Sequence, residues 1–148
     1  MAEYLMNSVQ NVALNAPILF GNSISCPKRN VFHTDDTGIF ILRGRTNNCF
    51  ARYHVTFNGN IAIPEGTAAA IAVALAVNGE ARPTSKAIYT PAGAGEFGNV
   101  TSTAIITVPQ GCCFSLSLRA VPATDDPTVT PVPAINVQNA NIVINRIA

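Results

Sequence analysis

The 148-residue sequence is poor in charge, contains no tryptophan and has only four cysteines. Charged residues make up 11% of the chain, against about 25% in an ordinary soluble domain. Its nine basic and eight acidic residues are scattered, so it lacks the basic patch that binding to a nucleic-acid polymer requires. No apolar run approaches the roughly 18 residues of a membrane helix. We therefore expect neither nucleic-acid binding nor membrane insertion.

The first ten residues lack the basic segment and apolar core of a secretory signal. We expect synthesis in the cytoplasm without a signal peptide, although a virion or spore component can still end up outside the cell. In that setting Cys26, Cys49, Cys112 and Cys113 are expected to be reduced thiols, and their spacing forms no zinc knuckle. Inert burial in a strand-rich core is the environment we expect for them.

Alternating apolar and polar residues predict strands along most of the chain, whereas helical periodicity is nearly absent. The clearest predicted strand covers 49–57, and Asn58, Gly59 and Asn60 supply a turn that ends it. Further strands are expected at 9–14, 17–20, 38–42, 69–77, 97–108, 112–121 and 141–147, with a proline-rich loop at 122–133. Roughly eight to ten strands predict one all-β domain over residues 1–148, a sandwich or barrel.

The predicted strand at 69–77 is apolar on both faces, so something must pack closely on each side. Large residues at its odd positions can face the sandwich core. The even positions, Ala70, Ala72, Ala74 and Ala76, leave a row without polar atoms, which a loop or a neighbouring subunit must cover. Because the chain has too little charge to coat a monomer, we favour a neighbouring subunit.

Several segments occur in the order of the strands of a known superfamily. These are 33–42 (HTDDTGIFIL), 49–59 ending in VTFNG, 72–79 ending in LAVNG, 108–113 and 137–148. Over nearly its whole length the chain resembles the complement-head and TNF-like superfamily, in its bacterial or phage branch, such as the C-terminal heads of collagen-like spore-surface glycoproteins. The resemblance implies a TNF-like, two-sheet antiparallel jelly-roll sandwich that forms a homotrimer. No Gly-X-Y stalk precedes the domain, so a stand-alone head is implied.

Arg43, Arg45 and Arg52 are the sharpest local feature, because they place three guanidinium groups within ten residues of a charge-poor chain. Guanidinium groups suit carboxylate or phosphate. In a trimer, three copies of these arginines could converge on one cleft and bind a small anionic ligand. Hydrogen bonding between subunits, or solubilisation, is the structural alternative.

Two acidic pairs, Asp35 with Asp36 and Asp125 with Asp126, fall in predicted loops, where oxygen ligands could hold calcium. Asp is also an ordinary turn residue, so calcium is the one cofactor that we consider. Neither histidine lies in a motif with a nucleophile, and a thiol nucleophile would need a histidine partner. We therefore expect no catalytic residues and no enzyme activity.

Two functions remain open. The first is a non-enzymatic structural or adhesive module of a phage particle, spore or cell surface, in contact with glycan or protein. The alternative is a soluble, phage-encoded binding protein that sequesters a small anionic, nucleotide-like ligand in intersubunit clefts.

Denatured protein that has been protected from air should titrate with four free thiols, because adjacent cysteines make a strained pair and the chain lacks a secretory context. A thiol reagent added after denaturation counts them. Two or fewer free thiols would contradict the prediction.

Overall fold

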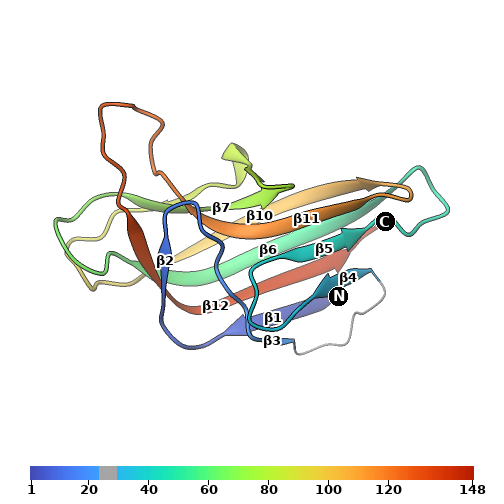
Figure 1. Cartoon of the computed structure of the whole chain (residues 1–148), viewed down its shortest axis with the longest axis horizontal. Helices are drawn as coiled ribbons and strands as arrows, with labels where there is room; N and C mark the ends of the chain where they lie inside the picture. Colours follow the sequence, from blue (N-terminus) through green and yellow to red (C-terminus); the bar gives the residue numbers. More distant parts are fainter. Residues whose placement is uncertain (24–29) are drawn as a thin grey trace.

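Two antiparallel sheets pack face to face in the computed structural model, which describes residues 1–23 and 30–148 (Figure 1). The first sheet has the strand order β10-β6-β12-β1-β3, with β2 also paired to β12. Its strands are β1 (Ala2–Met6), β2 (Gln10–Ala13), β3 (Asn22–Ser23), β6 (Phe50–Ala62), β10 (Gly98–Pro109) and β12 (Ala134–Arg146).

The second sheet has the order β4-β5-β11-β7-β8, with β9 also paired to β7. Its strands are β4 (Val31–His33), β5 (Phe40–Arg43), β7 (Ile71–Val77), β8 (Glu80–Ala81), β9 (Ala87–Tyr89) and β11 (Cys113–Val121). The short 3₁₀ turn η1 (Pro83–Ser85) is the one helical element among the described residues, and no helix there is long and apolar enough to cross a membrane.

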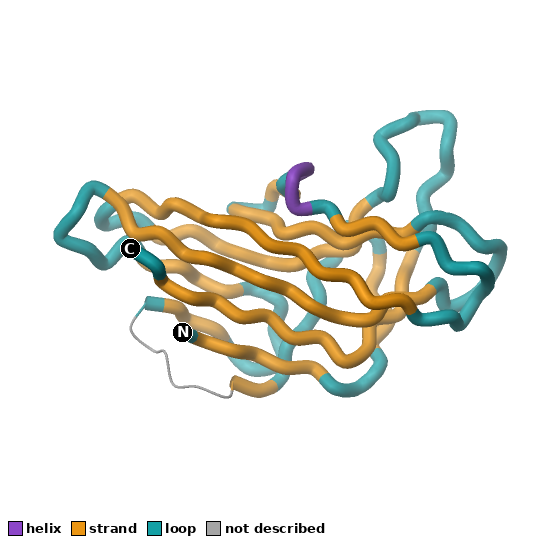
Figure 2. The backbone as a smooth tube through the Cα atoms, turned by 180° about the vertical axis from the view of Figure 1, so that it is seen from behind, coloured by secondary structure: helices purple, strands orange, loops and turns teal. Residues whose placement is uncertain are grey.

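Strands from the two halves of the chain pair in a nested order. β1 pairs with β12, β5 with β11, β6 with β10, and β7 with β9. This wrapping of one half of the chain along the other produces a jelly roll, and Figure 2 shows its long strands running side by side. The predicted all-β, two-sheet antiparallel jelly-roll sandwich is confirmed.

Strand β6 lies between β10 and β12 in the first sheet and follows the predicted alternation. Ala51, Tyr53, Val55 and Phe57 are fully buried in the core between the sheets. The predicted turn at 58–60 is wrong, because β6 continues to Ala62. Pairing explains the continuation, since this part of β6 lies between β10 and β12 and both neighbours bond to it.

Most other predicted strands are confirmed with small shifts at their ends. The segment 17–20 is an exception, because it forms only isolated bridges, from Pro17 to Arg119 and from Phe20 to Thr37. Pro17 has no N–H to donate to a ladder, which limits strand formation there. Five short strands were not predicted, and each has at most five residues: β1, β3, β4, β8 and β9. β12 also begins seven residues earlier than expected, at Ala134.

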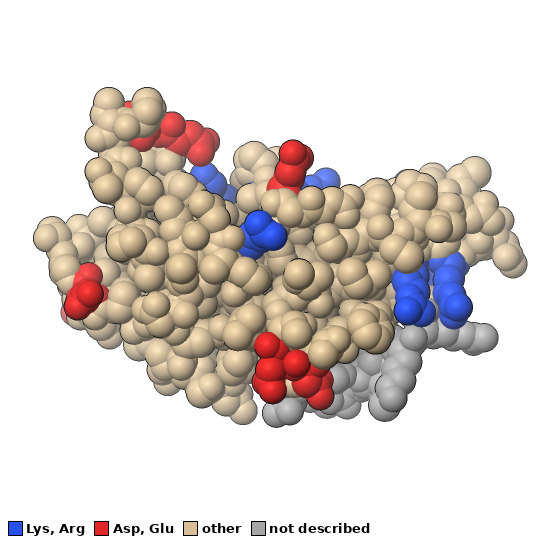
Figure 3. All heavy atoms as spheres, viewed as in Figure 1, with Lys and Arg blue, Asp and Glu red and all other residues tan. Residues whose placement is uncertain are grey.

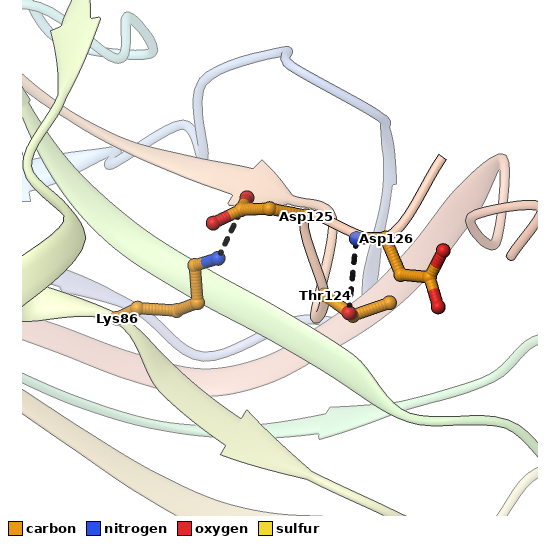
Figure 4. A network of polar contacts seen from close by, with 4 residues as sticks. All are labelled: Lys86, Thr124, Asp125 and Asp126. Atoms are coloured by element: carbon orange, nitrogen blue, oxygen red, sulfur yellow. Dashed lines mark hydrogen bonds and ion pairs between the residues drawn. The ribbon is translucent and has the colours of Figure 1, made fainter. Parts of the chain in front are cut away.

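The alanine row does not require a second subunit. Within the single chain Ala72, Ala74 and Ala76 are at most 1% exposed, whereas Ala70 precedes β7 and is exposed. The first part of the 122–133 loop packs over this face, where Val121 and Ala123 contact the alanines. Lys86 and Asp125 pair beside it at 3.6 Å (Figure 4). The expectation that a neighbouring subunit covers the row is therefore wrong, since the chain's own loop covers it.

Gly44 joins the loop after β5 to the hairpin between β10 and β11. Its N–H donates to the carbonyl oxygen of Cys112 at 2.8 Å, and its carbonyl oxygen accepts from the N–H of Gly111 at 3.0 Å. A Cβ at position 44 would collide with the backbone oxygen of Pro109. Only glycine fits this close approach of two backbones.

The substitution Gly44→Ala should lower the free energy of unfolding by about 1–3 kcal/mol or more, because Gly44 is buried and the colliding atom belongs to the backbone of a hydrogen-bonded hairpin. Urea denaturation followed by circular dichroism measures the change. Gly93→Ala is the matched control, since a Cβ there meets nothing within 4 Å. Equal stability of the two variants would contradict the proposed packing.

Candidate functional site

The three arginines singled out in the sequence lie at the same end of the sandwich, and of the three Arg45 lines the pocket described below. Their convergence on a cleft between subunits stays a prediction. Arg43, at the end of β5, is half-buried, and its guanidinium carbon lies 6.0 Å from the ring centre of Phe32. Arg52 is exposed on the outer face of the first sheet, 4.7 Å from the ring centre of Phe50. Arg45 is exposed in the loop that follows β5.

Arg45 lines a surface pocket of about 610 Å³ together with a second arginine, Arg146. The pocket lies where the start of β4, the loop after β5 and the end of β12 meet. Basic side chains gather near this end of the molecule (Figure 3). We call this the basic pocket, and the residues that line it within the described part of the chain are Asn30, Arg45, Thr46, Asn47, Asn48 and Arg146. These six residues include no carboxylate.

Hydrogen bonds hold Arg146 in this pocket. Its Nη1 donates to Oδ1 of Asn30 at 3.2 Å, and its Nε donates to the main-chain oxygen of Ala148 at 3.0 Å. These bonds use two of the five N–H donors of a guanidinium group. Arg45 has neither a hydrogen-bond partner nor a carboxylate partner within the described residues, so its charge is available to a ligand.

The loop that carries Arg45 is held against the β10–β11 hairpin. Besides the Gly44 bonds, the N–H of Gln110 donates to the carbonyl oxygen of Cys49 at 2.9 Å. The side-chain amide of Gln110 donates to the carbonyl oxygen of Thr46 at 3.1 Å, and Oγ1 of Thr46 accepts from the N–H of Asn48 at 3.1 Å. The loop is thus tied at both ends, and its side chains lie on a fixed backbone.

Tyr53 lies beneath the basic pocket and ties three strands together. It is fully buried, and its hydroxyl contacts the carbonyl oxygens of Arg43 at 2.6 Å and Asn30 at 3.2 Å. Burial raises the pKa of the Tyr53 phenol, and the nearby charge of Arg146 opposes that rise. The residue therefore positions both Asn30 and the segment that leads to Arg45.

Arg146 and Asn30 were not singled out from the sequence. Arg146 pairs with Tyr53 through the β12–β6 register, and Asn30 reaches the pocket through β4. Both residues lie too far from Arg45 along the chain to form a local sequence motif with it. Only the jelly-roll order, which places the end of the chain beside the start of β6, could have indicated the association.

The two acidic pairs lie at separate places. Asp36 has a positive φ of 62°, and Asp35 contributes, after burial, to a raised pKa of the Tyr4 phenol. Asp125 faces Lys86 and Asp126 points away from it (Figure 4).

Hydrogen bonds from the backbone and the side chain of Thr128 lower the pKa of Asp126. No group of three or more His, Cys, Asp or Glu side chains that could hold a metal ion occurs among the described residues. Calcium binding by the four aspartates stays a prediction.

The thiols differ from the expectation of burial. Cys49, Cys112 and Cys113 are free and exposed, because they lie in or beside the loops at the end of the sandwich, whereas Cys26 lies outside the described residues. Nε2 of His33 donates to the carbonyl oxygen of Thr37 at 2.9 Å, and its buried Nδ1 has no partner among the described atoms. His54 is 2.9 Å from Oγ1 of Thr103.

The outer face of the first sheet is a second candidate surface with little charge, and Glu3 on β1 at its side accepts from Nδ2 of Asn141 at 3.2 Å. Arg52 is the one charged residue among the outward positions of β6, β10 and β12, all of which the structure describes. We call the following outward residues the neutral face: His54, Thr56, Asn58, Asn60, Asn99, Thr101, Thr103, Ile105, Thr107, Asn141, Val143 and Asn145.

Side chains of the neutral face hydrogen-bond to one another across the strands. The Nδ2 of Asn99 donates to Oδ1 of Asn60 at 3.1 Å, and Oγ1 of Thr101 donates to Oδ1 of Asn58 at 3.1 Å. These neutral pairs form a ladder beside the His54–Thr103 contact. Polar atoms on this surface are therefore already partly satisfied within the chain.

No protein-family model and no curated protein sequence matches this chain. Solved structures match it over nearly its full length. The globular domain of zebrafish complement 1qA is 14% identical, with a TM-score of 0.59, and the match covers 96% of this chain and 94% of that one.

Two further structures show the same likeness. The Eiger TNF from S. frugiperda is 12% identical with a TM-score of 0.61, covering 100% of this chain and 92% of that one. Murine APRIL is 10% identical with a TM-score of 0.55, covering 95% and 96%. The chain therefore has the complement-head and TNF-like jelly-roll fold, as its sequence indicated. The bacterial or phage branch stays a prediction.

The substitution Tyr53→Phe should lower the free energy of unfolding by about 1–3 kcal/mol at neutral pH, because it leaves the buried carbonyl oxygen of Arg43 without its donor. Urea denaturation measures this loss, and Tyr89→Phe is a control in which no hydroxyl bond of this kind is removed.

The stability difference between wild type and Tyr53→Phe should shrink above pH 10. The folded pKa of Tyr53 is raised above its ordinary value of 10.0, so the phenol ionises in the unfolded chain before it ionises in the folded one. Wild type then loses stability that the phenylalanine variant cannot lose. A difference that grows with pH would contradict this assignment.

Proposed function

We propose that this chain is a non-enzymatic subunit of a homotrimer that assembles through the neutral face and serves as a structural or adhesive module of a phage particle, spore or cell surface. The observation that carries the proposal is the near absence of charge across the outer face of three long strands. A charge-poor surface of this extent is typical of a contact between subunits.

The hydrogen-bond ladder supports assembly on energetic grounds. Covering a polar side chain costs free energy when its bond to water is lost and not replaced. On the neutral face, Asn and Thr side chains already bond to one another across the strands. A second subunit can therefore cover them at a lower desolvation cost than it could cover charged residues.

The number of subunits rests on the resemblance to the complement-head and TNF-like superfamily. Charge patterning indicates that the face is covered, but it cannot count copies. Closed threefold symmetry satisfies the interface without leaving an open edge for further growth. The surface role is likewise supported by the resemblance to the heads of spore-surface glycoproteins.

The non-enzymatic assignment is supported by the surroundings of the groups that could do chemistry. His54 contacts a threonine hydroxyl on an open sheet face, and His33 donates to a backbone carbonyl oxygen. Among the described residues, neither histidine contacts a thiol. Within the part of the chain that the structure describes, no thiol therefore has a histidine placed to activate it, and the threonine hydroxyl beside His54 lies on an open sheet face rather than in a cleft.

The alternative, a soluble protein that sequesters a small anionic ligand, is supported by the basic pocket. Purified protein that carries such a ligand should show it in native mass spectrometry together with the subunit count. Attachment to particles, without a retained ligand, favours the structural module instead.

Light scattering at low micromolar concentration should give about three times the 15.5 kDa chain mass. The substitution Ile105→Glu should yield monomers, because it places a carboxylate in the proposed contact, where burial of an unpaired charge costs several kcal/mol.

Ile88→Glu is the matched control. Ile105 is 55% exposed on the neutral face, and Ile88 is 56% exposed on β9, away from that face. The control should remain trimeric. A monomeric wild type, or a trimer that tolerates Ile105→Glu, would overturn the proposed interface.

A further inference from the structure

The basic pocket combines positive charge with neutral hydrogen-bonding groups. Arg45 and Arg146 supply two guanidinium groups, and no lining residue is acidic. The Arg146 guanidinium is already oriented by Asn30 and Ala148, so little conformational freedom is lost when it meets a ligand. Two guanidinium groups without a neighbouring carboxylate among these lining residues attract an anionic ligand.

The remaining lining residues point to a ligand with hydroxyl groups. Asn30, Asn47 and Asn48 carry amides that both donate and accept, and Thr46 carries a hydroxyl. Amides and hydroxyls complement the hydroxyl groups of a sugar ring, because each sugar hydroxyl can also donate and accept hydrogen bonds. A phosphate ion alone presents mainly acceptors and would leave the amide oxygens unmatched.

The size and the composition of the pocket restrict the class of ligand further. A volume of about 610 Å³ lies within the range of ordinary small-molecule sites, roughly 300–1,000 Å³. The six described lining residues include no aromatic ring, so among them neither a nucleobase nor the apolar face of a neutral sugar finds a stacking partner. Charge and hydroxyl recognition are the interactions that remain.

We propose that the basic pocket binds an acidic sugar, with the carboxylate on Arg45 and Arg146 and the ring hydroxyls on the asparagine amides and Thr46. The six described lining residues lie within the single chain and none belongs to the neutral face. The recognised group is a uronic acid unit, free or as part of an acidic polysaccharide.

Isothermal titration with glucuronate, using the full-length protein, tests the proposal. Wild type should bind glucuronate, and Arg45→Ala should weaken binding at least about tenfold, the size expected for one lost charge-assisted hydrogen-bond pair. Arg45 is exposed and unpartnered within the described residues, so this variant should fold normally, as its thermal unfolding will show. Arg43→Ala is the control, since Arg43 lies at the same end of the molecule but does not line the pocket.

Two further ligands test recognition of the carboxylate and recognition of the sugar ring separately. Glucose, which lacks the carboxylate, should bind at least about tenfold more weakly than glucuronate. Inorganic phosphate should also bind more weakly, because it cannot use the amides fully. Phosphate binding equal to that of glucuronate would overturn the sugar assignment. Absence of glucuronate binding, or an equal loss in Arg43→Ala, would overturn the site itself.

The titration also distinguishes this site from the proposed assembly. Ile105→Glu should still bind glucuronate whatever its mass in light scattering, because the neutral face contributes no residue to the pocket. Loss of binding in that variant, with unchanged thermal unfolding, would contradict a site contained in one chain.

Discussion

The alternation of side chains along β6 is the constraint on which both surfaces of this protein depend. Its inward residues, including Tyr53 and Phe57, fill the core, while its outward residues form the middle of the neutral face. β6 pairs with β10 on one side and with β12 on the other. A register slip of one residue would therefore expose the aromatic rings and bury the polar ladder together.

The same strand also sets the position of the basic pocket. Tyr53 is an inward residue of β6, and its hydroxyl reaches the carbonyl oxygens of Arg43 and Asn30. The register that pairs β12 with β6 then brings Arg146 to the same end. Loop residues such as Arg45 complete a site whose frame is made by strand pairing, so the core and the pocket share one register.

The local alternation of apolar and polar residues could predict the strands, but it could not predict which segments pair with them or pack over them. The alternation at 49–57 was sufficient for β6, whereas Asn58, Gly59 and Asn60 resembled a turn because their neighbours on β10 and β12 cannot be seen in the sequence. The expected burial of the alanine row holds for Ala72, Ala74 and Ala76 but not for Ala70. Its cover came from residues 121–125, which the sequence marked only as the edge of a proline-rich loop.

Arg45 was identifiable because charge is scarce around it, yet Arg146 was not, since its role follows from tertiary pairing alone.

The scarcity of charged residues has a physical consequence for the whole surface. With few charged residues, their placement decides which areas stay hydrated and which can be covered at low cost. Arginines gather at one end, where loops face solvent, and the outward positions of β6, β10 and β12 carry almost none. The neutral face and the basic pocket share no residue, so the proposed assembly and the proposed anion binding do not compete for the same side chains.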